Sequence, residues 1–156
     1  MRTLLKAAVT TFALDQAIKY VVLFVLDLDR VRQIDVLPPF LRLVMGWNEG
    51  INFGLLSGST DLARWALILL ALAISAWIWG MARREPRNRT VQISAGLLIG
   101  GALSNVLDRL LYGAVADFLN MSVPGIDNPY SFNVADVAIF IGALGLAFFS
   151  TRDKTP

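Results

Sequence analysis

Histidine and cysteine are both absent from the sequence. Without them the chain cannot build a Ser-His-Asp triad, a Cys-His pair or a zinc site ligated by histidine. The absence of cysteine also excludes a disulfide framework. Any hydrolytic chemistry must therefore use carboxylates or a Ser-Lys pair, and we expect neither a cofactor nor a metal.

Charge is also scarce, because charged residues make up 17% of the chain and the net charge is +2. This small excess does not favour a nucleic-acid partner. Hydrophobic residues reach 56%, whereas roughly 45–50% is usual in soluble domains. The composition therefore predicts one integral-membrane domain over residues 1–156.

Four apolar stretches have lengths close to the roughly 20 residues that cross a hydrocarbon core of about 30 Å. They predict an all-α membrane protein with transmembrane helices at 7–26, 65–82, 91–111 and 133–150. Between the first two helices, segment 27–62 contains Pro38-Pro39 followed by residues that favour β-structure. We expect a small β-rich subdomain there, and a mobile lid loop over 112–132.

The basic residues predict the orientation in the membrane. They precede the first helix, join the second to the third, and follow the fourth: Arg2, Lys6, Arg83, Arg84, Arg87, Arg89, Arg152 and Lys154. Because cytoplasmic loops carry an excess of Lys and Arg, both termini are expected in the cytoplasm. Segments 27–62 and 112–132 are then extracytoplasmic.

Two aspartates fall at the outer interface in this topology. Asp117 follows the exit of the third helix and Asp136 lies just inside the start of the fourth. A carboxylate near the bilayer is costly unless it faces a polar cavity, so both are candidate functional residues. Two close carboxylates share a proton, and such a pair can activate water as in aspartic proteases. The alternative is that Asp136 caps its helix and Asp117 lies in a solvated loop.

Other polar residues fall near the same interface. Asn105, Asp108 and Arg109 share one face of the third helix, and Asn133 shares a face with Asp136. For the adjacent Asp108 and Arg109, we expect an ion pair that anchors the helix end.

Three further features have structural interpretations. Asp15 and Lys19 have the i, i+4 spacing of a salt bridge. Asn48 and Gly50 are typical of a turn, and Gly100-Gly101 favours close helix packing.

Several blocks of the sequence resemble the lipoprotein signal peptidase (signal peptidase II) family. They occur in the family's order across nearly the whole chain: Asp15-Gln16 with Lys19, Asn48-Glu49-Gly50 with Phe53, Gly100 to Arg109, Gly113 to Phe118, and Phe132 to Asp136. Two positions depart from the family pattern: Ser104 replaces a usual glycine, and Asn52 replaces a small apolar residue.

The resemblance implies an aspartyl endopeptidase of the bacterial inner membrane. It would remove the signal peptide from prolipoproteins at the extracytoplasmic face, by cleavage on the N-terminal side of a diacylglyceryl-modified cysteine. It would act as a monomer in contact with membrane lipid. Cyclic peptides of the globomycin type would inhibit it. The resemblance makes Asp117 and Asp136 catalytic, and it assigns the supporting positions to Asp15, Asn48, Gly50, Asn105, Arg109 and Asn133. We add Lys19 and Asp108 to the supporting residues, because their positions on the first and third helices place them near the same outer interface.

Three other classes of protein fit parts of the pattern. A small transporter would use intramembrane acids such as Asp15 as proton relays. A membrane scaffold would need no chemistry at all. A Ser-Lys peptidase would require Lys19 beside an outer serine, either Ser57 or Ser104.

Overall fold

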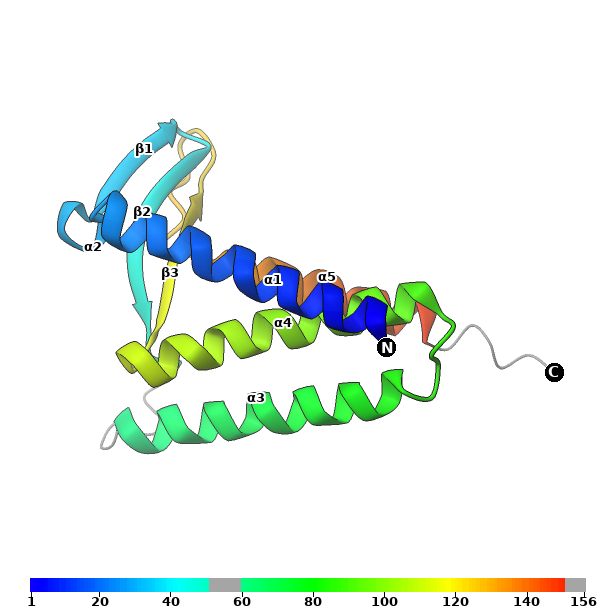
Figure 1. The fold of residues 1–156 in the computed structure, drawn as a ribbon. Helices are drawn as coiled ribbons and strands as arrows, with labels where there is room; N and C mark the ends of the chain where they lie inside the picture. The colour runs from blue at the N-terminus through cyan, green and yellow to red at the C-terminus, as the bar shows by residue number, and fades with distance from the viewer. Residues whose placement is uncertain (51–59, 151–156) are drawn as a thin grey trace.

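The computed structural model describes residues 1–50 and 60–150. Its helices run alongside one another, and a small sheet projects from one end of the bundle (Figure 1). The N-terminus and the connection between α3 and α4 lie at the opposite end (Figure 1). The basic residues of segment 83–89 are therefore at the end of the bundle that is remote from the sheet.

The helices agree closely with the apolar stretches. Helix α1 spans Arg2–Tyr20 and continues as the π-helical turn η1, Val21–Val25; α3 spans Thr60–Ala82, α4 Arg89–Tyr112 and α5 Val134–Phe149. Within residues 1–50 and 60–150, three segments are long and apolar enough to cross a membrane, namely Arg2–Val25, Asp61–Ala82 and Arg89–Tyr112. Helix α5 is apolar but has 16 residues, so the fourth crossing remains a prediction.

Helix α4 is the centre of the bundle and packs against α1, α3 and α5. Glycines make the closest of these approaches possible. A Cβ atom on Gly100 would lie 2.4 Å from the carbonyl oxygen of Ala8 in α1, and one on Gly101 would lie 2.6 Å from that of Ala135 in α5. The predicted role of Gly100-Gly101 in close packing is therefore confirmed.

The sheet combines strands from the two segments that the sequence predicts to be extracytoplasmic. The short helix α2 (Leu28–Val31) precedes β1 (Gln33–Leu37) and β2 (Leu41–Asn48), and the third strand is β3 (Val115–Met121). The order is β1-β2-β3 with antiparallel pairing. The prediction of a loop over the whole of 112–132 was therefore wrong, because Val115–Met121 is a strand paired with β2.

Apolar side chains attach the sheet to the C-terminal end of α1 and its continuation η1. Phe118 and Ala116 of β3, Met45 of β2, and Val22 and Leu23 of η1 form one buried cluster with Leu28. Strand β3 alternates, so the side chain of Asp117, which lies between Ala116 and Phe118, is on the other face of the sheet. The packing of the apolar face thus fixes where the carboxylate of Asp117 lies.

Candidate active site

Asp117 and Asp136 reach the site from different kinds of element. Asp117 lies on β3, directly opposite Gly46 of β2, and is 5% exposed. Asp136 lies in the first turn of α5 and is half-buried. Placing Asp117 on a strand corrects the alternative in which it belonged to a solvated loop.

Two asparagine side chains connect the carboxylates. Asn133 Nδ2 donates to Asp117 Oδ1 at 2.6 Å and to Asn105 Oδ1 at 3.3 Å, while Asn105 Nδ2 donates to Asp136 Oδ1 at 3.0 Å. A third asparagine, Asn48, donates from Nδ2 to Asp117 Oδ2 at 3.0 Å. Both oxygens of Asp117 therefore accept a hydrogen bond from a neutral amide.

Asp136 also caps the helix that carries it. Its backbone N–H donates to Asn133 Oδ1 at 2.9 Å, and its Oδ2 accepts from the backbone N–H of Asn133 at 3.1 Å, which forms a reciprocal capping box. The capping that the alternative interpretation gave to Asp136 is therefore present. It uses one carboxylate oxygen, and the other oxygen faces Asn105.

Lys19 bridges two further carboxylates behind the dyad. Its ammonium lies 2.7 Å from Asp15 Oδ2 and 2.6 Å from Asp108 Oδ2, and it donates to Asn105 Oδ1 at 3.1 Å. Asp15 and Asp108 are fully buried and Lys19 is 3% exposed. The predicted salt bridge between Asp15 and Lys19 is confirmed, and Asp108 completes the cluster.

This cluster also holds the backbone on either side of the dyad. Asp108 Oδ2 accepts from the backbone N–H of Ala116 at 3.2 Å, and Asp15 Oδ1 accepts from that of Ala135 at 2.8 Å. Each supporting carboxylate therefore binds the residue that immediately precedes a dyad aspartate.

The expected ion pair of Asp108 with Arg109 was wrong, because Asp108 pairs with Lys19. The physical reason is helix geometry: neighbouring residues do not share a helix face. Arg109 Nη1 instead donates to the carbonyl of Asn105 at 3.3 Å. Its side chain lines an apolar cavity of about 260 Å³ between α3, α4 and α5.

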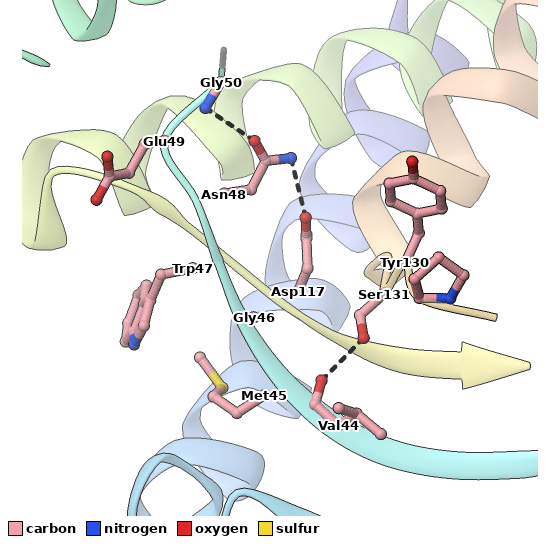
Figure 2. A pocket seen from close by; sticks show the side chains of 11 residues that line it. Val44, Met45, Gly46, Trp47, Asn48, Glu49, Gly50, Asp117, Tyr130 and Ser131 are labelled. Atoms are coloured by element: carbon pink, nitrogen blue, oxygen red, sulfur yellow. Dashed lines mark hydrogen bonds between the residues drawn. The ribbon is translucent and has the colours of Figure 1, made fainter. Parts of the chain in front are cut away.

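Asn48 and Gly50 do form the expected turn, since the N–H of Gly50 donates to Asn48 Oδ1 at 2.9 Å. Gly50 has a φ of 93°, a conformation that favours glycine. The turn leaves the amide of Asn48 free to reach Asp117 (Figure 2). Sequence reasoning assigned the turn but not this contact.

Two polar residues of the cluster were not predicted as site residues. Gln16 Nε2 donates to Asp108 Oδ1 at 2.8 Å and to Ser104 Oγ at 2.9 Å. Ser104 Oγ donates to Asp15 Oδ2 at 2.7 Å. The i, i+4 spacing of Ser104 and Asp108 is the signal that could have shown a shared face.

The arrangement of Ser104 bears on the Ser-Lys alternative. Its hydroxyl is fully buried and donates to a carboxylate, while Lys19 carries an ion pair on either side. A serine nucleophile needs a neutral base beside it, and this geometry does not provide one. Ser57, the other candidate, and Asn52 lie outside the described residues.

A cavity of about 310 Å³ opens beside Asp117 (Figure 2). Strand β2 forms one wall and the segment containing Pro129, Tyr130 and Ser131 forms the other.

The surroundings of Asp117 raise its pKa to about 6 from the ordinary value of 3.8. Burial is the largest cause, and the negative charge of Asp136 is the second. The hydrogen bonds from Asn48 and Asn133 and the charge of Lys19 lower the pKa, but by less. Asp117 therefore holds a proton at a higher pH than an exposed aspartate does.

Comparison with known proteins identifies the family. The family model described as signal peptidase (SPase) II matches residues 7–152. The chain is 44% identical to a lipoprotein signal peptidase of Methylobacterium sp. (strain 4-46), over 91% of this chain and 84% of that protein. It is 42% identical to the one from Nitrobacter hamburgensis, over 96% of this chain and 92% of that protein.

Solved structures agree with this relationship. A bacterial membrane enzyme solved at 1.9 Å superposes with a TM-score of 0.82 at 28% identity, over 99% of this chain and 96% of that one. A second, solved at 2.3 Å, gives 0.78 at 26% identity, over 100% and 95%. The match of the family model over most of the sequence, together with these relatives, shows that the chain belongs to the signal peptidase II family of membrane aspartyl peptidases.

Proposed function

We propose that this chain cleaves the signal peptide from diacylglyceryl-modified prolipoproteins, and that Asp117 and Asp136 activate the water that attacks the scissile bond. The family and the names of the relatives support the substrate class. The observation that carries the chemistry is the asparagine bridge, which holds two carboxylates from separate elements in one hydrogen-bonded unit.

The environments of the two aspartates suggest different roles. Asp117 is buried and has a pKa of about 6, so it is the member that holds the shared proton and donates it to the scissile carbonyl oxygen. Asp136 is half-buried and accepts a hydrogen bond on each oxygen, and we assign it the role of general base. It removes a proton from water, and the water oxygen attacks the carbonyl carbon.

The remaining steps need no other nucleophile. The proton taken up by Asp136 passes to the leaving amine as the C–N bond breaks, and the carbonyl oxygen returns the other proton to Asp117. The asparagines keep both carboxylates in place, so the reacting groups are oriented before the substrate arrives. Asp15 and Asp108 act through the backbone as positioning residues, and Lys19 acts through these two carboxylates.

The location of the reaction follows the charge distribution. The family and the apolar helices support an integral protein of the bacterial inner membrane. The sheet, whose strand β3 carries Asp117, is at the end of the bundle opposite the basic segment 83–89 (Figure 1). Cytoplasmic termini and an extracytoplasmic active site, at the membrane surface where the lipid of the substrate remains in the bilayer, fit the positive-inside rule.

The test is cleavage of a diacylglyceryl-modified prolipoprotein by the purified protein and by Asp117→Asn, Asp136→Asn and the double variant. Each single variant should lose several orders of magnitude in kcat, and the double variant should be little slower, because residues that act as one unit are not additive. Asp127→Asn is the matched control, since Asp127 is on the surface at 82% exposure and pairs with Arg42.

Thermal unfolding in detergent verifies that the variants fold. Substantial turnover by a folded Asp117→Asn or Asp136→Asn protein would refute the dyad. Absence of cleavage by the unmodified protein, with a folded site, would refute the substrate class.

A further inference from the structure

The strand position opposite Asp117 is occupied by a glycine. Gly46 of β2 and Asp117 of β3 are direct partners in the antiparallel register. Side chains of such partners are on the same face of a sheet, with Cβ atoms about 4.5–5.5 Å apart. A side chain at position 46 would therefore lie next to the Asp117 carboxylate.

Neither the backbone nor the packing requires glycine here. Gly46 is not among the described glycines that have a positive φ. A Cβ atom built on it would meet only the backbone oxygen of Asp117, at 3.7 Å, an ordinary van der Waals distance. By contrast, a Cβ on Gly100 or Gly101 would collide with the backbone of a neighbouring helix.

The space that the missing side chain leaves belongs to the cavity beside Asp117. Gly46 lines that cavity, and Tyr130 and Ser131 lie across it (Figure 2). A hydrogen bond of 2.9 Å from Ser131 Oγ to the carbonyl of Val44 holds this opposite wall against β2. The width of the cavity next to the carboxylate is thus set by position 46 on one side and by residues 129–131 on the other.

We propose that Gly46 determines which substrate side chains this enzyme accepts beside Asp117, by leaving room for a large residue at one position close to the scissile bond. This inference rests on the proposed function of the dyad. A side chain at position 46 would occupy the same space from the β2 side of the cavity. It would exclude large substrate residues but leave the carboxylates of Asp117 and Asp136 in place.

The experiment uses Gly46→Ala and Gly46→Val with a panel of diacylglyceryl-modified prolipoproteins. The two residues before the modified cysteine and the residue after it are each changed in turn to Gly, Ala, Val and Leu. At one of the three positions, the Gly46→Val enzyme should show a kcat/KM at least about tenfold lower for substrates with Val or Leu there, relative to the substrate with Gly there. This size is expected because small steric differences in a pocket are worth about 10–200-fold. Gly46→Ala should show a smaller effect in the same direction.

Gly80→Val in α3 is the matched control, because a Cβ at Gly80 meets nothing within 4 Å and the residue is exposed. It should leave the preference unchanged. An equal loss for every substrate in a folded Gly46→Val protein, or no change for any, would overturn the proposal. If the unmodified protein cleaves none of the panel, the proposed function fails instead, so the two failures are distinguishable.

Discussion

Asp108 accepts a hydrogen bond of 3.2 Å from the backbone N–H of Ala116, the residue before Asp117. Asp15 makes the equivalent contact with Ala135, the residue before Asp136, at 2.8 Å. Because Lys19 lies between the two supporting carboxylates, a single ammonium group connects the backbone of the strand to that of the helix. The relative position of the dyad therefore depends on a charged cluster that is itself buried.

Removing the carboxylate charge at position 108 should reduce activity more than stability. Asp108→Asn keeps the size of the side chain and leaves Lys19 paired with Asp15. It weakens the acceptor for the N–H of Ala116, so Asp117 moves, and a displacement of about 1 Å can cost about 10²-fold. We expect kcat/KM to fall by about 10–100-fold.

The matched control for this change is Asp35→Asn, which removes an aspartate from the sheet surface at 52% exposure. It should retain activity. Wild-type kcat/KM in a folded Asp108→Asn protein would show that the contact with Ala116 does not position Asp117.

Lys19 should be important for stability. Lys19→Met preserves the length of the side chain but leaves Asp15 and Asp108 buried without their cation. Breaking a buried ion pair by removal of one partner costs about 3–5 kcal/mol, so thermal unfolding in detergent should occur at a clearly lower temperature. Lys6→Met, on the exposed face of the same helix, is the control and should unfold like the unmodified protein.

Adding Asp15→Asn and Asp108→Asn to Lys19→Met should restore part of the lost stability, since the unpaired charges are then removed. No recovery in the triple variant would mean that packing, rather than uncompensated charge, causes the loss.

The rate should fall on the alkaline side at an unusually low pH. Asp117 has a pKa raised to about 6, chiefly by burial and then by the charge of Asp136. Above that pH the pair loses the shared proton, and no acid remains to polarise the scissile carbonyl. The pH profile of kcat/KM, which reports groups of the free enzyme, should be bell-shaped with its alkaline limb near 6, both limbs belonging to the pair.

Asn48→Ala provides a check on this assignment. It removes one of the two hydrogen bonds that lower the pKa of Asp117, so the alkaline limb should move to higher pH. A limb that does not move, although the variant folds and chemistry limits the rate, would show that another group titrates there.

The sequence predicted the helices well, because long apolar runs leave few alternatives in a membrane. It also identified Asp117, Asp136 and the three asparagines, which the structure brings together. Strand β3 was missed for two reasons. Segment 112–132 is rich in turn residues at its end, and β3 pairs with β2, which is far away in the sequence, so no local pattern reveals the pairing.

Pairing among the buried charges could not be read from the sequence for a similar reason. Lys19 and Asp108 meet only because α1 and α4 approach closely at Gly96 and Gly100. Ser104 was identified only as a departure from the family pattern and as a candidate serine beside Lys19, whereas its hydroxyl donates to Asp15. Spacing along one helix gives shared faces, but partners on other helices depend on the tertiary packing.

Gly101 couples that packing directly to the dyad. A Cβ atom there would lie 2.6 Å from the carbonyl oxygen of Ala135 and 2.9 Å from Ile139 Cγ1, so Gly101→Val must push the start of α5 away from α4. Overpacking of this kind costs about 1–3 kcal/mol, and the shift would carry Asp136 away from Asn105. We expect kcat to fall at least about 10²-fold with a modest loss of thermal stability, whereas Gly80→Val, in open space on α3, should change neither. Full activity in a folded Gly101→Val protein would mean that the start of α5 can relax without moving Asp136.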